Sequence, residues 1–137
     1  PSIVMECVFC KREPESHNHL FFSCTFIQPI WKQLMTLCDF TWNSTSWQQT
    51  VEWATRIFHG KSLSSLVGKV SLSCMVYTIW LERNRREFSE DFRDTKTILS
   101  EILFLVRCRL SSLRKFKRTS ANCHIQHSWP LQDDIFS

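Results

Sequence analysis

Cys7-Val-Phe-Cys10, followed by His19-Leu-Phe-Phe-Ser-Cys24, brings three thiols and an imidazole together within eighteen residues. Zinc(II) prefers four tetrahedral ligands drawn from thiolate sulfur and imidazole nitrogen, and a Cys-x2-Cys turn lets two sulfurs reach one ion. We therefore predict one bound Zn2+ with the ligands Cys7, Cys10, His19 and Cys24. Four protein ligands leave no position for water or substrate, so the predicted site is structural.

His17 competes with His19 for the imidazole position. We prefer His19 because the apolar run Leu20-Phe21-Phe22 follows it and can anchor the ligand loop in a core, whereas His17 lies in a polar run. The competing interpretation of the cluster is that seven cysteines in 137 residues include buried apolar thiols. That interpretation suits three cysteines in apolar, helix-like stretches: Cys38, Cys74 and Cys108.

The composition indicates one soluble domain with its own core. Apolar residues make up 43% of the chain and aromatic residues 13%, which is sufficient for a core at this length. No apolar run approaches the roughly 20 residues that cross a bilayer, and no signal segment opens the chain, so we expect no membrane association. Cysteines at metal-ligand spacing favour a reducing compartment, which predicts a nuclear or cytoplasmic protein.

Helices are expected to dominate, with little or no sheet, because only two glycines are present to form hairpin turns. After a zinc loop over 5–26, apolar periodicity predicts a bundle of about four helices near 27–38, 46–59, 62–89 and 94–117. A polar loop is expected over 39–46. Ser46 and Asp94 should cap helices, and Gly60 should end one. Residues 1–118 are then one domain, and residues 119–137 an irregular tail.

Two features of the predicted helices allow alternatives. Gly68, inside the third helix, indicates either a close helix contact or a break. In the last helix the apolar residues follow a heptad pattern: Phe92, Leu99, Val106 and Leu113 lie seven apart, with Leu103 and Leu110 between them. We favour a stripe that faces the core, and keep self-association through its uncovered part as a secondary hypothesis.

The net charge of +4 is modest, but the basic residues are concentrated near one end. The window 107–118 contains no carboxylate and six cations, namely Arg107, Arg109, Arg114, Lys115, Lys117 and Arg118. On one continuous helix, Arg107, Arg114 and Arg118 would lie near one side, where they could contact phosphates. Alternatively, these cations complement the negative end of the helix dipole and need no ligand.

The ligand loop carries further candidates for nucleic-acid contact. Lys11 and Arg12 could touch phosphates, or they could offset the negative charge of three thiolates. Phe9, between two thiolates, is the candidate for stacking on an unpaired base, whereas Phe21 and Phe22 are expected in the core.

Two blocks of the sequence resemble one known family. Cys7-x2-Cys10, Glu15-Ser-x2-His19-Leu-Phe-Phe-x-Cys24 and Trp31 look like the zinc-binding domain that follows the reverse transcriptase in plant LINE-type (non-LTR) retrotransposons. Val76-Tyr-Thr-Ile-Trp80-Leu-Glu-Arg-Asn-Arg85-Arg-Glu-Phe88 resembles a segment downstream of that site in the same proteins. The resemblance covers roughly residues 5–118. It implies an accessory domain that is associated with nucleic acid, with Cys7, Cys10, His19 and Cys24 as zinc ligands.

We expect no enzymatic activity and no small-molecule substrate. Nothing resembles the paired aspartates of a polymerase, and the sequence contains no glycine-rich phosphate loop and no HExxH helix. The first ligand comes only six residues after the start, unlike family members with a longer upstream segment, so we expect a fragment or a domesticated descendant. Two functional hypotheses follow. One is a nucleic-acid-associated module for RNA or DNA; the other is a protein-interaction or dimerisation module that uses the Leu-rich C-terminal helix.

Overall fold

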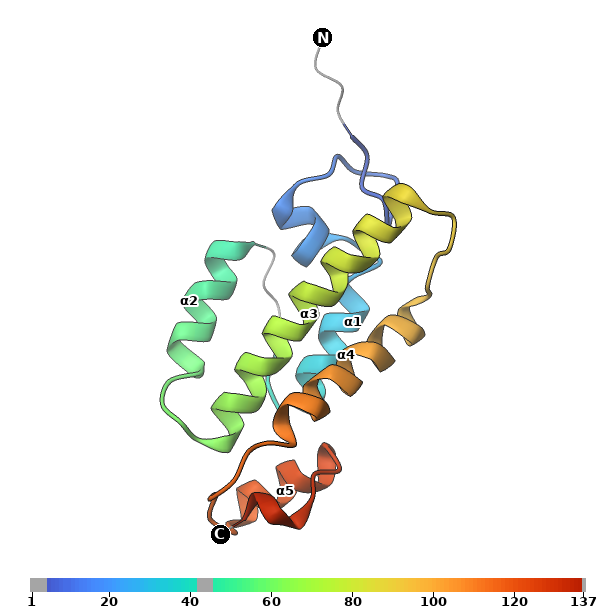
Figure 1. Cartoon of the computed structure of the whole chain (residues 1–137). Helices are drawn as coiled ribbons and strands as arrows, with labels where there is room; N and C mark the ends of the chain where they lie inside the picture. Colours follow the sequence, from blue (N-terminus) through green and yellow to red (C-terminus); the bar gives the residue numbers. More distant parts are fainter. Residues whose placement is uncertain (1–4, 42–45, 137) are drawn as a thin grey trace.

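The computed structural model describes residues 5–41 and 46–136, and this part of the chain is mainly helical (Figure 1). The α-helices are α1 (Gln28–Leu37), α2 (Trp47–Ile57), α3 (Leu63–Phe88), α4 (Thr95–Leu110) and α5 (Ser120–Ser128). A π-helical turn covers His19–Ser23, and a 3-10 turn covers Asp133–Ile135. Extended pairing in the described residues is limited to two isolated bridges. The predicted mainly α fold is confirmed.

Local signals set the ends of the first helices close to the predicted positions. The Ser46 hydroxyl accepts a hydrogen bond from the Gln49 amide, and the Asp94 carboxylate accepts one from the Thr97 amide. Pro29 lies in the first turn of α1, where its missing N–H has no helical partner to lose. Helices α1, α2 and α3 each begin and end within two residues of the predicted bounds. Of the predicted loop over 39–46, residues 42–45 lie outside the described part.

The core lies where α3, α4 and α1 meet, with α4 running back along α3 (Figure 1). The inward line of α4 is Ile98, Ile102, Val106 and Leu110, each at most 1% exposed. Residues four apart along a helix lie on one face, so this line replaces the predicted heptad seam. Leu99 and Leu103 are half-buried beside it. Val106 and Leu110 of the Leu-rich stripe are therefore buried within the monomer, and Leu99, Leu103 and Leu113 are partly buried against the core, as the core-facing interpretation expects, while Phe92 is 49% exposed.

Gly68 marks a close contact and not a break. Helix α3 continues without interruption from Leu63 to Phe88, and Gly68 is buried. A Cβ atom at this position would overlap the aromatic ring of Phe58, the residue that follows α2. The missing side chain therefore allows the Phe58 ring to lie directly on the α3 backbone.

Two predictions for the C-terminal part are wrong. Helix α4 ends at Leu110 and not near 117, and the Ser111 and Ser112 hydroxyls donate to the carbonyls of Cys108 and Arg109 at its end. Such bonds satisfy carbonyls that a helix end leaves unpaired. The predicted irregular tail over 119–137 contains α5, which Thr119 caps through the Asn122 amide.

This C-terminal segment packs onto the rest of the protein. Trp129 and Ile135 are 2% and 1% exposed, and the Phe116 amide donates to the Ile135 carbonyl at 2.9 Å. The burial of these two side chains fixes a segment that has little apolar periodicity of its own.

By length and composition alone, α3 is apolar enough to cross a membrane, although no such segment was expected from the sequence. Half of its most apolar window is buried inside the protein, and the core helix of a globular protein passes the same test. Its buried face also carries Ser71, Thr78 and Glu82, which are polar groups that hydrocarbon would not satisfy.

Candidate metal centre

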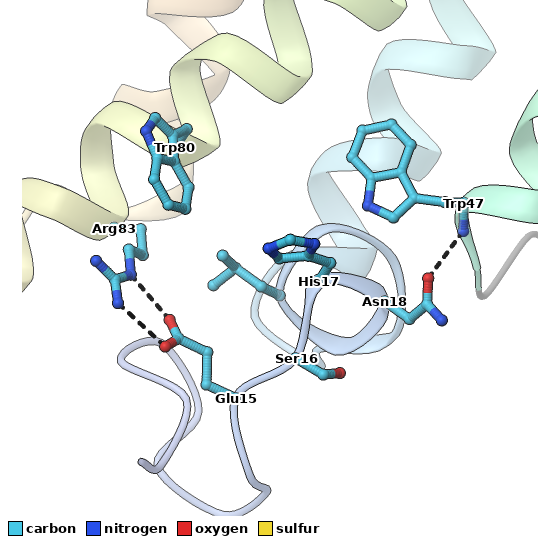
Figure 2. A pocket seen from close by; sticks show the side chains of 8 residues that line it. Glu15, Ser16, His17, Asn18, Trp47, Trp80 and Arg83 are labelled. Atoms are coloured by element: carbon cyan, nitrogen blue, oxygen red, sulfur yellow. Dashed lines mark hydrogen bonds and ion pairs between the residues drawn. The ribbon is translucent and has the colours of Figure 1, made fainter.

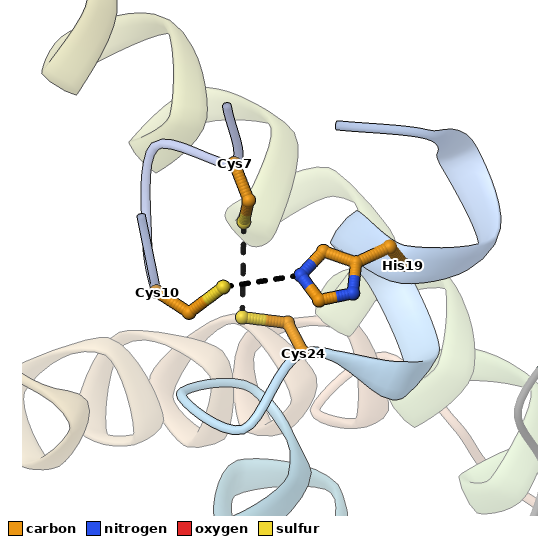
Figure 3. Close-up of side chains that lie close together, drawn as sticks. All are labelled: Cys7, Cys10, His19 and Cys24. Carbon is orange, nitrogen blue, oxygen red and sulfur yellow. Dashed lines mark hydrogen bonds between the residues drawn. The ribbon is translucent and has the colours of Figure 1, made fainter. Parts of the chain in front are cut away.

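The four predicted ligand side chains converge on one point (Figure 3). Their ligand atoms all lie within 4.8 Å of one another. The Cys10 sulfur is 3.2 Å from Nε2 of His19, and the Cys7 and Cys24 sulfurs are 3.8 Å apart. His17 lies outside this cluster and lines a neighbouring pocket. The group can hold one metal ion, and His19 supplies its imidazole.

The spacing fits a single tetrahedral ion. Two sulfurs bound at about 2.3 Å to one ion, at the tetrahedral angle, lie about 3.8 Å apart, which matches the separation of the Cys7 and Cys24 sulfurs. A disulfide would bring two sulfurs to about 2.05 Å, and all the cysteines are free. Three sulfurs and one imidazole nitrogen are also a donor set typical of a closed zinc site.

Short-range hydrogen bonds shape the ligand loop. The Lys11 amide donates to the Cys7 carbonyl at 2.9 Å, which closes the turn that carries Cys7 and Cys10. Lys11 adopts a positive φ of 55° to complete this turn. On the other side of the site, the Cys24 amide donates to the His19 carbonyl at 2.8 Å and ends the π-helical turn. Each pair of ligands is thus positioned by its own local turn.

The sulfurs of Cys7 and Cys24, 3.8 Å apart, are joined by a hydrogen bond. The hydrogen bond from Cys24 lowers the pKa of Cys7 to about 5, against the opposing effect of burial. The same hydrogen bond, together with burial, raises the pKa of the Cys24 thiol. A divalent ion supplies the positive charge that allows both groups to ionise.

Aromatic residues form a small core around the site. Phe21 and Phe22 are 5% and 0% exposed, as predicted. Trp31 stacks on Phe22 with ring centroids 5.7 Å apart, and its indole nitrogen donates to the Phe21 carbonyl. Phe9 was predicted to stack on nucleic-acid bases, and this prediction is wrong. Its side chain is 8% exposed and stacks on Phe26 at 5.2 Å, so it belongs to the core.

A buried charge network links this core to α3 and α4. The Glu82 side chain is 1% exposed and accepts hydrogen bonds from Arg85, Arg86 and the amide of Arg93. The Arg86 guanidinium also lies over three phenylalanine rings, those of Phe9, Phe26 and Phe92, at 4.6–5.0 Å from their centroids. Arg86 therefore joins the metal loop to the segment between α3 and α4.

A second ion pair ties the loop to α3. Arg83 donates through Nε and Nη2 to the two carboxylate oxygens of Glu15, at 2.9 and 3.1 Å. This bidentate bond lowers the pKa of Glu15 and raises that of Arg83. Sequence reasoning missed the contact because the two residues are 68 positions apart and no local signal joins them.

The predicted nucleic-acid-binding cations form two separate groups at opposite ends of the molecule (Figure 1). Lys11 and Arg12 are exposed on the metal loop. At the other end, α4 stops at Leu110, so Arg114 and Arg118 do not share a helix face with Arg107, and that prediction is wrong.

Carboxylates offset part of the C-terminal group. Arg114 and Arg118 face Asp134 and Asp133 at 3.0 and 3.8 Å. In the described part of the chain, the exposed side chains of Arg107, Lys115 and Lys117 form no ion pair. Arg109 is likewise exposed and has no ion pair among the described residues, so these four are the group's remaining candidates for phosphate contact.

Comparison with known proteins found no matching family model, no matching curated protein and no matching solved structure. The family resemblance therefore rests on its motif residues. The structure adds that the two resembling blocks contact each other. Glu15 of the first block pairs with Arg83 of the second, and Phe21 stacks on Trp80 at 6.3 Å.

Proposed function

We propose that the chain is a non-catalytic zinc-binding module in which one structural Zn2+ fastens residues 5–26 to the helical core. The convergence of Cys7, Cys10, His19 and Cys24 carries this proposal. Thiolate and imidazole ligands in a tetrahedral arrangement favour zinc over the harder cations Mg2+ and Ca2+, which prefer oxygen. Because all four positions are filled by protein, the ion stabilises the fold and does not activate water.

We further propose that the module is associated with nucleic acid, in the manner that its resemblance to the reverse transcriptase zinc-binding domain implies. The net charge of +4 supports this proposal. Within the two groups of candidate cations, the exposed side chains that have no carboxylate partner in the described residues support it too: Lys11 and Arg12 on the metal loop, and Arg107, Arg109, Lys115 and Lys117 near the other end. Such cations are free to contact phosphates, which releases condensed counterions and makes the affinity depend on salt.

Metal analysis tests the first part of the proposal. Protein purified without chelator should contain about one zinc per chain, because four ligands complete one tetrahedral site. The Cys108→Ser variant should keep the same content, since Cys108 is exposed and lies outside the cluster. A zinc content near zero in folded protein would contradict the proposal.

Salt titration tests the second part. The affinity for a labelled single strand should fall as salt rises. Combining Lys115→Ala with Lys117→Ala should reduce the slope of log K against log salt by about 1.4, at about 0.7 per phosphate contact. The matched control combines Lys32→Ala with Lys96→Ala, two exposed lysines on α1 and α4 that lie outside the basic window 107–118, and should leave the slope unchanged. Absence of binding to RNA and DNA at low salt would contradict nucleic-acid association.

A further inference from the structure

A pocket of about 600 Å³ opens beside the metal loop, where the loop faces α2 and α3 (Figure 2). Its lining residues are Glu15, Ser16, His17, Asn18, Leu20, Trp47, Trp80 and Arg83. The metal ligands do not line it, and the structural role of the metal does not use it. Two tryptophans, an imidazole, an amide and an ion pair around one opening are an arrangement typical of a ligand site.

The two tryptophans give the pocket an aromatic wall. Trp80 is 42% exposed, which is unusual for so large an apolar side chain, and Trp47 is half-buried. Phe21 packs behind both of them, with ring centroids 5.3 Å from Trp47 and 6.3 Å from Trp80. Because Phe21 is fixed in the core, both indoles are held in place before any ligand arrives.

Polar groups are placed around this wall. The Asn18 side-chain oxygen accepts a hydrogen bond from the Trp47 amide at 2.9 Å, which leaves its NH2 group as a donor. The His17 ring lies between the two indoles in the view of Figure 2. At the other side, Arg83 neutralises Glu15 in the bidentate pair, so the pocket has no unpaired carboxylate that would repel a nucleic acid.

We propose that this pocket holds one unpaired base of a single-stranded nucleic acid, with the base against the exposed indole of Trp80. This inference rests on the proposed nucleic-acid association and specifies where a base is bound. Every base has an apolar face for an indole and a polar edge for hydrogen bonds, and the His17 ring, which lies between the two indoles in Figure 2, is the polar group placed to meet that edge. Arg12, exposed in the same loop, is available to the sugar-phosphate backbone.

Two other ligand types fit the pocket less well. An aromatic side chain from a peptide would gain the contact with the indole but no hydrogen bond with His17, whereas a base can gain both. A methylated cation would need a free negative charge or an open aromatic cage. Glu15 is already neutralised by Arg83, and the Arg83 guanidinium, 5.3 Å from the centroid of the Trp80 ring, would repel a second cation but not a neutral base.

The test compares two strands with equal numbers of phosphates, one carrying bases and one abasic, by fluorescence anisotropy at low salt. We expect the base-containing strand to bind more tightly to the wild-type protein. Trp80→Ala should weaken its binding about 5- to 150-fold, the range of base–aromatic stacking, and should not change binding of the abasic strand. Phe88→Ala is the matched control, because Phe88 is an 83% exposed aromatic on the same helix outside the pocket.

His17→Ala gives an independent measurement, because His17 is exposed and its removal leaves the core intact. The His17→Ala variant should weaken binding of the base-containing strand and leave binding of the abasic strand unchanged. If Trp80→Ala fails to fold, this variant tests the base site in its place. Equal affinity for both strands, or unchanged binding by these variants, would overturn the inference. An aromatic peptide that binds in a Trp80-dependent way, when the strands do not, would overturn it as well.

Failure of the pocket and failure of the proposed function give different results. If binding still depends on salt and on Lys115 and Lys117, but not on Trp80, nucleic-acid association stands and the base site is wrong. If neither strand binds at low salt, both are wrong.

Discussion

Cys10→Ser should release the metal and cause the largest loss of stability of any substitution considered. Its sulfur lies 3.2 Å from Nε2 of His19 within the ligand group, and a serine hydroxyl is a poor ligand for zinc. Structural zinc contributes about 10–16 kcal/mol of apparent binding free energy in zinc-finger peptides. A natural domain has only about 5–15 kcal/mol of total stability. We therefore expect the variant to bind no zinc and to be largely unfolded over 5–26 at room temperature.

Metal analysis and thermal unfolding followed by circular dichroism measure this effect. The matched control is Cys108→Ser, which changes an exposed thiol outside the ligand group and should melt within a few degrees of the wild-type protein. Acidification should act like the substitution, because protons compete with the metal for thiolate and imidazole. A Cys10→Ser protein that retains one zinc and melts with the wild-type protein would refute the structural role of the site.

Glu82→Ala should reduce the free energy of unfolding by about 3–5 kcal/mol, the usual effect of removing one partner of a buried ion pair. The Glu82 carboxylate accepts a hydrogen bond from Arg86 Nε at 2.9 Å and another from the Arg93 backbone amide at 3.2 Å. The Arg86 side chain is itself only 8% exposed. Without Glu82, its positive charge would remain buried among phenylalanine rings with no carboxylate to balance it.

Urea unfolding measures the loss, and Glu87→Ala is the control. Glu87 is exposed on the same helix, so its removal should change stability by no more than about 0.5 kcal/mol. Replacing both partners, as Glu82→Leu with Arg86→Met, should restore part of the lost stability because the buried Arg86 charge is then removed as well, whereas the Arg85 side chain is 27% exposed and can be solvated. If Glu82→Ala and Glu87→Ala unfold at the same urea concentration, the network does not stabilise the fold.

Features fixed by neighbouring residues could be predicted from the sequence. The metal ligands are such a case, since the turn at Cys7 and Cys10 and the π-helical turn from His19 are each closed by short-range bonds. Helix starts at Ser46 and Asp94 are another, because a side-chain cap acts within three residues.

Features that depend on distant partners could not be predicted. An aromatic residue in a loop can face either solvent or a core, and Phe9 is buried because Phe26 and Arg86 lie beside it. The pairing of Glu15 with Arg83 is equally non-local. Helix α5 has no buried residue of its own, so its sequence contains no apolar periodicity from which a helix could be predicted. Its position depends on Trp129 and Ile135, which pack beyond its end.

The contacts of Arg83 and Arg86 with the metal loop determine how far the chain can be shortened before the loop loses its fold. Both arginines lie in the C-terminal half of α3, about sixty residues after the loop, and they hold Glu15 and Phe9 in place. An excised peptide of residues 5–26 would carry every ligand but would lack these supports. We therefore expect that the metal loop does not fold as an independent zinc finger. The shortest fragment that folds and binds the metal should extend at least to the end of α3.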